Sequence, residues 1–83
     1  MRAPYTIIVE APGRRARVAC ESADLGEHMS SFVGALTEHR GPGARLWVLS
    51  PSAFVETQVT RWTFEGNGWR RVEAFETPFS KAA

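Results

Sequence analysis

The sequence has one cysteine, one lysine and no long apolar run. The single thiol, Cys20, can form neither an intrachain disulfide nor a Cys-rich zinc site, which is typical of a reducing compartment, so we expect a cytoplasmic protein. No uninterrupted apolar stretch approaches the ~20 residues that cross a bilayer, and the first residues lack the charged-then-apolar pattern of a signal peptide. We therefore expect no membrane segment and no export.

Motifs that carry chemistry are missing as well. His28 and His39 lie eleven residues apart on a predicted helix, which separates them by ~16 Å along its axis, so they cannot share a metal ion. There is no H-E-x-x-H, C-x-x-C or Asp-rich loop, and no base is placed near Cys20. The segment Ala11–Arg15 lacks the G-x-x-x-x-G-K-[ST] pattern and leads into a strand, so it is interpreted as a turn. We expect no metal, no cofactor and no enzyme activity.

The charge balance is nearly even. Ten basic and nine acidic residues give a net charge of +1, which excludes a strong global attraction to nucleic acid or to an anionic membrane. Nine of the ten basic residues are arginine. Arginine suits bidentate contact with carboxylate or phosphate, although a general coding bias towards arginine explains the same count. Binding to such groups must therefore depend on local patches.

The length and composition predict one α+β domain over residues 1–83, with a frayed tail at 78–83. The chain is 83 residues long and 43% hydrophobic, which allows a core to form. A chain this short buries only about 60 to 65% of the surface it exposes when unfolded. Binding to a partner or to a second copy would therefore add to its stability.

The first half of the chain predicts a hairpin followed by a helix. Tyr5–Glu10 is typical of a strand, Ala11–Arg14 of a type II turn, and Arg15–Cys20 of a returning strand. In that strand we expect Ala16, Val18 and Cys20 to face inward and Arg15 and Arg17 to face water. Ser22 is the expected N-cap of the helix, which should end near His39 or Arg40, before Gly41-Pro42-Gly43. The expected apolar stripe of this helix is Leu25, Met29, Phe32, Val33 and Leu36.

The second half predicts three strands. Arg45–Leu49 is apolar on both faces and therefore central, and Glu56–Phe64 and Trp69–Phe75 form a hairpin around Glu65–Gly68. The result is a two-layer ββαβββ arrangement, a mostly antiparallel sheet with a single helix on one face. This order of elements resembles the β-grasp (ubiquitin-like) layout. The resemblance implies that a strand after the helix lies parallel to the first strand.

The last hairpin concentrates aromatic and basic side chains. With Gly66-Asn67 as the turn, Phe64 faces Trp69 and Trp62 faces Arg71, which places the aromatic rings on one face of the sheet. Two interpretations stay open for that face. It is either the core covered by the helix or an exposed surface.

One helix can cover only one side of a sheet, whereas the predicted strands are apolar on both sides. An uncovered apolar face is typical of a protein interface, and a second copy is the simplest cover. We therefore expect a non-enzymatic interaction module that forms a homo-oligomer through the helix-free face or the last hairpin. Its expected contact residues are Trp47, Trp62 and Trp69, with Arg70 and Arg71 at the polar edge.

The alternative function is nucleic-acid binding through arginine-rich hairpins. The residues concerned are Arg14, Arg15, Arg17 and Arg61, together with Arg70 and Arg71. Basic and aromatic side chains on adjacent strands could hold phosphates and stack bases.

Overall fold

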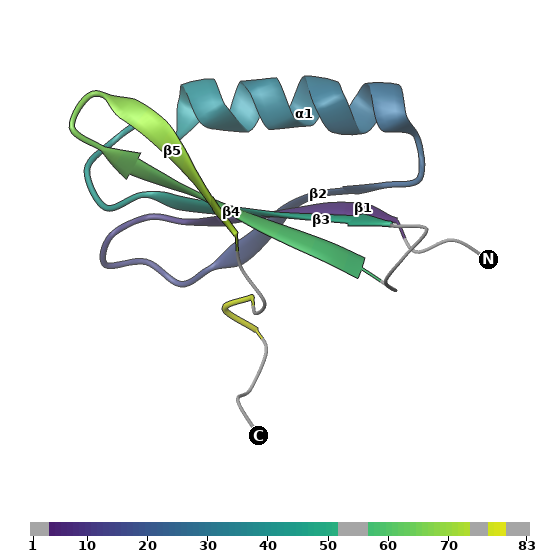
Figure 1. The fold of residues 1–83 in the computed structure, drawn as a ribbon, viewed down its shortest axis with the longest axis horizontal. Helices are drawn as coiled ribbons and strands as arrows, with labels where there is room; N and C mark the ends of the chain where they lie inside the picture. The colour runs from purple at the N-terminus through teal and green to yellow at the C-terminus, as the bar shows by residue number, and fades with distance from the viewer. Residues whose placement is uncertain (1–3, 52–56, 74–76, 80–83) are drawn as a thin grey trace.

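The computed structural model describes residues 4–51, 57–73 and 77–79. Over these residues the chain forms one helix and five strands in the expected ββαβββ order, with the helix on one face of the sheet (Figure 1). The strands are β1 (Tyr5–Glu10), β2 (Arg17–Ser22), β3 (Arg45–Pro51), β4 (Thr57–Glu65) and β5 (Gly68–Glu73), and the helix is α1 (Leu25–Glu38). The predicted two-layer α+β class is confirmed.

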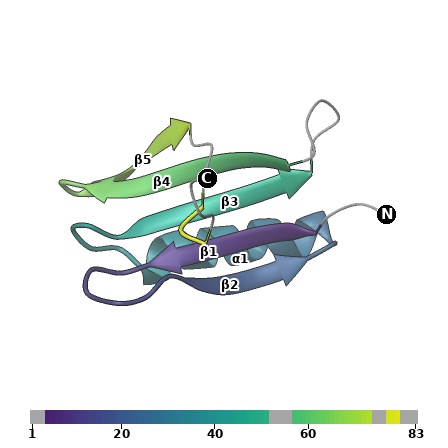
Figure 2. The same ribbon diagram turned by 90° about the horizontal axis from the view of Figure 1, so that it is seen from below.

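The strands follow the order β2-β1-β3-β4-β5, and every neighbouring pair is antiparallel (Figure 2). The parallel pairing with the first strand that the β-grasp resemblance implied is therefore wrong for β3, the strand that follows the helix. Since β2 and β3 both run antiparallel to β1, they run parallel to each other on either side of it. The helix supplies the crossover that this parallel pair needs. The central position expected for β3 is confirmed.

The hairpin of β1 and β2 contains the expected turn and an unexpected bulge. The amide of Arg14 donates to the carbonyl oxygen of Ala11 at 3.0 Å, and Gly13 has a φ of 75°, which is type II turn geometry. Ile7 pairs with Cys20 but Ile8 pairs with Val18, so one extra residue stands in β2. Val18 and Cys20 therefore lie on opposite faces, and the expectation that both face inward is wrong.

The same bulge affects the rest of the edge strand. Arg17 pairs with Val9, a residue of the core, so Arg17 lies on the helix side of the sheet, where it is exposed. A period-two pattern places residues correctly only while the pairing register is unbroken.

The helix is capped at Asp24 rather than at Ser22. The carboxylate of Asp24 accepts a hydrogen bond from the amide of Glu27 at 3.0 Å. The hydroxyl of Ser22 accepts from the amide of Asp24 at 3.0 Å and so holds the capping residue in place. Both bonds satisfy amides near the positive end of the helix. At the other end His39 is the C-cap, as the sequence predicted.

The core lies between α1 and the centre of the sheet. Ile7, Val9 and Leu46 from the strands meet Ala35 of the helix, and all four are buried. The half-buried side chains that pack around them are Cys20, Phe32, Leu36, Trp62 and Trp69. The aromatic face of the last hairpin therefore contributes to the core, which decides between the two interpretations left open by the sequence.

The hairpin of β4 and β5 is tied to the C-terminal end of α1. The indole Nε1 of Trp69 donates to the carbonyl oxygen of Leu36 at 2.8 Å, and this ring meets Phe64 edge-on at 5.3 Å. Arg40 stands over the Phe64 ring at 5.7 Å and donates to the carbonyl oxygen of Asn67 at 3.0 Å. Figure 1 shows β5 rising beside this end of the helix.

We expect replacement of Trp69 by phenylalanine to lower the free energy of unfolding by about 1 kcal/mol or more. Phenylalanine keeps an aromatic ring against Phe64 but cannot donate to the carbonyl of Leu36. Urea denaturation followed by circular dichroism measures the change. An unchanged unfolding midpoint would show that this bond does not help to hold the hairpin against the helix.

Candidate functional site

The helix does not lie over the middle of the sheet. It packs mainly over β1 and β2, and Figure 2 shows it behind these two strands. His28 and Ala35 are the buried residues of the helix, and Phe32 and Leu36 are half-buried. The expected apolar stripe is therefore divided.

Three members of that stripe are turned away from the sheet. Leu25, Met29 and Val33 are 53%, 50% and 59% exposed, so the expectation that they form part of the core-facing stripe is wrong. They are spaced four residues apart and form one row along the helix. The row lies on the flank that faces β3, β4 and β5, because Met29 lines a cavity together with residues of these three strands.

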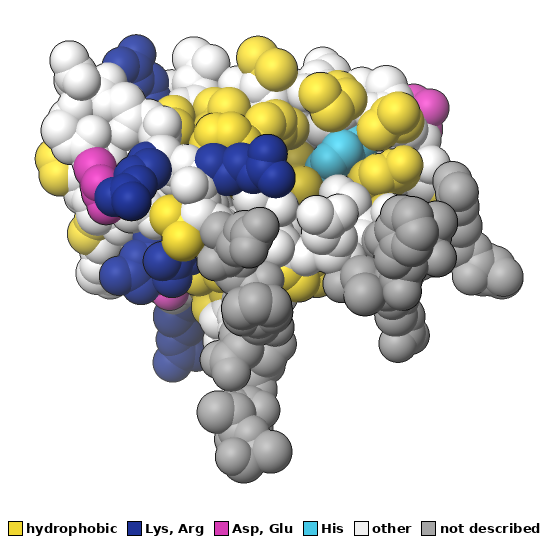
Figure 3. All heavy atoms as spheres, in the orientation of Figure 1, with side chains coloured by type: hydrophobic (Ala, Val, Ile, Leu, Met, Phe, Trp, Pro, Cys, Tyr) yellow, Lys and Arg dark blue, Asp and Glu magenta, His cyan; other side chains and the backbone are white. Residues whose placement is uncertain are grey.

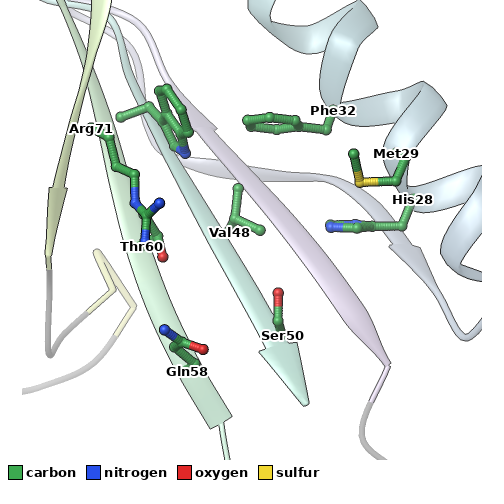
Figure 4. A pocket seen from close by; sticks show the side chains of 9 residues that line it. His28, Met29, Phe32, Val48, Ser50, Gln58, Thr60 and Arg71 are labelled. Carbon is green, nitrogen blue, oxygen red and sulfur yellow. The ribbon is translucent and has the colours of Figure 1, made fainter. Parts of the chain in front are cut away.

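Beside this row is a cavity of about 260 Å³, open to solvent, which we call the α1–β5 groove (Figure 4). It is lined by His28, Met29 and Phe32 from α1, Val48 and Ser50 from β3, Gln58, Thr60 and Trp62 from β4, and Arg71 from β5. Apolar side chains thus meet hydroxyl, amide and guanidinium groups in one place. In the space-filling view, apolar side chains gather along α1 and the surface below it, with a histidine and basic side chains among them (Figure 3).

Arg71 is the cation of the groove. None of the described residues that line this cavity is acidic, and no ion pair of Arg71 is found among them. Its neighbour Arg70 faces the other side of the sheet, because Arg71 pairs with Trp62 and Arg70 with Thr63. Arg70 lies 3.5 Å from the carboxylate of Glu65. The groove therefore offers a positive charge that has no counterion in the described part of the chain.

His28 forms part of the groove wall at the N-terminal half of α1. It is only 4% exposed, and its ring stacks on Tyr5 with 4.7 Å between centroids. Burial lowers the pKa of His28 below its ordinary value, because the charged form loses its hydration. Its Nδ1 has no hydrogen-bond partner within the described part of the chain. The residue is therefore buried against Tyr5.

The helix-free face of the sheet is apolar at its centre, and that centre is already buried. Ile8 and Trp47 are paired neighbours on this face and are 2% and 6% exposed. The segment Thr77–Phe79 lies on the same side of the sheet (Figures 1 and 2). Arg61 is half-buried beside Trp47, and its Nε has no partner among the described residues.

The five expected contact residues do not form one surface. Trp62 and Trp69 pack against the core on the helix side, whereas Trp47 is buried on the opposite face. Arg71 lies in the groove, and Arg70 lies on the helix-free face. The exposed row of α1 could not be recognised as long as every apolar helix position was assigned to the core. The signal that could have revealed it was the width of the stripe, which is larger than one contact line can bury.

The arginines of the nucleic-acid alternative are also divided. Arg14, Arg15 and Arg17 line a cavity of about 320 Å³ together with Val9, Ala11 and His39. This cavity lies between the β1–β2 turn and the C-terminal end of α1. Arg61 lies in the helix-free face and is not part of this lining.

We predict that the free energy of unfolding decreases as the pH falls below about 6.5. The reason is that His28 binds a proton more tightly in the unfolded chain than in the folded one, where burial lowers its pKa. Folding favours the neutral form of a histidine whose pKa is lower in the folded chain than in the unfolded chain. Its contribution to the free energy of unfolding is therefore complete above the pKa of the unfolded chain and declines below it. His28→Phe keeps a ring on Tyr5 and should flatten this dependence, measured by urea denaturation at about pH 7.5 and about pH 5.5. In His39→Gln the dependence should remain, because His28 is still present. Equal pH slopes in the wild type and in His28→Phe would contradict the prediction.

Neither a protein-family model nor a curated protein nor a solved structure matches the chain. Within residues 4–51, 57–73 and 77–79 there is no cluster of three or more His, Cys, Asp or Glu side chains that could hold a metal ion. The same residues contain no helix with the length and apolar character needed to cross a membrane.

Proposed function

We propose that the protein is a non-enzymatic interaction module that associates with a second copy through the helix side of its sheet. The observation that carries this proposal is the exposed row of Leu25, Met29 and Val33 beside the α1–β5 groove. A row of large apolar side chains next to an open, partly apolar cavity is unusual on a surface that meets only water. A second chain that covers both would remove this apolar area from water.

The expected contact is small. One helix flank and one groove amount to a patch on the order of a few hundred Å² on each copy, below the ~800 Å² per partner of standard interfaces. Such an interface is compatible with dissociation constants in the micromolar range. The dimer should therefore form and dissociate reversibly as the protein concentration changes.

The helix side is favoured over the helix-free face for a physical reason. The two largest apolar residues at the centre of the helix-free face, Ile8 and Trp47, are already buried within one chain. They have little area left to lose on association. Among the described residues on that side of the sheet, Val18 is 49% exposed and Phe79 is 53% exposed, and the two do not form a row.

Met29→Glu should convert the dimer to a monomer, because a charge would be placed in the apolar contact. Val18→Glu is the matched control, since Val18 is as exposed as Met29 but lies on the other face. Both positions are half-exposed in the single chain, so both variants should fold. Sedimentation velocity over about 10 to 500 μM measures the association. Loss of the dimer in Val18→Glu but not in Met29→Glu would move the contact to the helix-free face and contradict the proposal.

The second candidate function is nucleic-acid binding at the arginine cavity. The observation that favours it is that Arg14, Arg15 and Arg17 line one cavity together with His39, and that none of the described lining residues is acidic. Arginine side chains grouped in this way can contact neighbouring phosphates. One observation weighs against this candidate. The C-terminal end of a helix carries partial negative charge, and the same arginines offset that charge without any nucleic acid.

This alternative predicts binding that weakens steeply with salt, because phosphate contacts release counterions. A mobility shift of mixed DNA and RNA oligonucleotides at about 50 mM salt measures it. The Arg14→Glu, Arg15→Glu double variant should abolish the shift, whereas Arg70→Glu should leave it, since Arg70 lies outside the cavity. The absence of a shift with the wild-type protein removes this candidate.

A further inference from the structure

We propose that the α1–β5 groove binds a small aromatic carboxylic acid that carries a ring hydroxyl, with its carboxylate at Arg71 and its hydroxyl at His28. This inference goes beyond the proposed self-association and does not rest on it, because the site is formed by a single chain. Of the three residues in the exposed row, Met29 lines the groove and Leu25 and Val33 do not. These two remain available to a second copy whether or not the ligand is bound.

The apolar wall of the groove contains two aromatic rings and a thioether. The ring centroids of Phe32 from α1 and Trp62 from β4 are 5.4 Å apart, at an interplanar angle of 59°, and both residues line the cavity with Met29. Phe32 and Trp62 are half-buried, so part of each ring is left to contact a guest. Aromatic rings favour tilted and offset contacts with one another, and a thioether also packs well against a ring. The wall therefore suits an aromatic ring better than an alkyl chain.

The polar groups of the groove lie opposite this wall. Figure 4 shows Ser50 and Gln58 towards one end, and Arg71 extending from β5 over β4, across the groove from the side chains of α1. A guanidinium binds a carboxylate through two parallel hydrogen bonds. The hydroxyls of Ser50 and Thr60 and the amide of Gln58 can donate to the remaining lone pairs of the same carboxylate. A cation beside an apolar wall gives the groove charge complementarity to an organic acid.

His28 distinguishes this groove from a mere gap in the packing. The residue is 4% exposed, and in Figure 4 its ring points from α1 towards Val48 on the floor of the groove. Its Nδ1 is buried and has no hydrogen-bond partner within the described part of the chain. Buried polar atoms nearly always have such a partner. An unsatisfied imidazole in the wall of an open cavity is therefore typical of a site that receives a polar group, and a hydroxyl can both donate to and accept from that ring.

The size of the groove limits the ligand. The cavity has a volume of about 260 Å³, which is below the ~300 to 1,000 Å³ of pockets that enclose drug-sized molecules. At ~30 Å³ for each water molecule of the liquid, this space corresponds to roughly nine waters, and so to a ligand of about ten non-hydrogen atoms. One ring with a short carboxylic acid arm and a hydroxyl is of this size, whereas a nucleotide is too large.

The probe for this site is para-hydroxyphenylacetate, measured by saturation-transfer NMR with the wild-type chain. A ligand this small should bind with a dissociation constant of about 0.1 to 1 mM. Phenylacetate lacks the hydroxyl and para-hydroxyphenylacetamide lacks the negative charge, so each should bind about tenfold more weakly. Octanoate has the charge and a similar size but no ring, and it should also bind more weakly than the probe.

Two arginines and two histidines provide matched controls for the position of the probe. Arg71→Gln should weaken binding of the acid about tenfold and leave binding of the amide unchanged, because only the acid uses the guanidinium charge. Arg70→Gln, next to Arg71 but on the other face, should leave both unchanged. The probe should shift the imidazole proton resonances of His28, against which it lies, but not those of His39, which caps the other end of α1. Circular dichroism confirms that both variants are folded.

Several outcomes would overturn this proposal. The absence of saturation transfer up to about 10 mM probe would do so, as would equal binding of the acid and the amide. Tighter binding of octanoate would contradict the aromatic assignment, and shifts at His39 in place of His28 would place the ligand elsewhere. Self-association is measured without any ligand, so the failure of one proposal is distinguishable from the failure of the other.

Discussion

A single helix of 14 residues must cover one face of a five-stranded sheet, and it is too narrow to do so. The crossover from β2 to β3 sets its place, because these strands flank β1 and the connecting helix lies over that region. The part of the helix side formed by β3, β4 and β5 is therefore not covered by α1. The exposed row on α1 and the α1–β5 groove both follow from this mismatch.

The protein offsets part of the mismatch with its last hairpin. Trp62 and Trp69 come towards the helix from β4 and β5, and the bond from Trp69 to the carbonyl of Leu36 holds them there. This closes the space at one end of α1. Near His28 and Met29 no such contact is made within the described chain, and the cavity remains open between them and Arg71. The position of the candidate site is thus set by where the hairpin stops covering the helix.

The local features were predictable because they depend on few residues. Pro12-Gly13 determines the first turn, and Gly66-Asn67 sets the register in which Phe64 meets Trp69 and Trp62 meets Arg71. The central place of β3 followed from its apolar character on both faces. Each of these depends on short-range chemistry that a single sequence contains.

The features that were missed depend on competition between elements. Ser22 and Asp24 are both favourable N-cap residues, so the preferences of the residue types do not decide which of them caps the helix. The alternation of apolar and polar residues in a strand does not indicate the bulge that places Val18 and Cys20 on opposite faces. The rotation of α1 about its own axis decides that Ala35 is buried while Val33 is exposed. That rotation is set by packing against the sheet, so it appears only when the whole domain is assembled. For the same reason Trp47 and Trp62 were assigned to one surface although they lie on opposite faces.

The methyl resonance of Met29 tests the central claim most directly, because the chain has only two methionines and this one lies in the row left uncovered by the narrow helix. With ¹³C-methyl methionine labelling, we expect its chemical shift to move as the protein is concentrated from about 10 μM to about 1 mM, while that of Met1 stays constant. A Met29 resonance that does not move over this range would mean that the row remains in water, and it would contradict the claim that a second copy covers it.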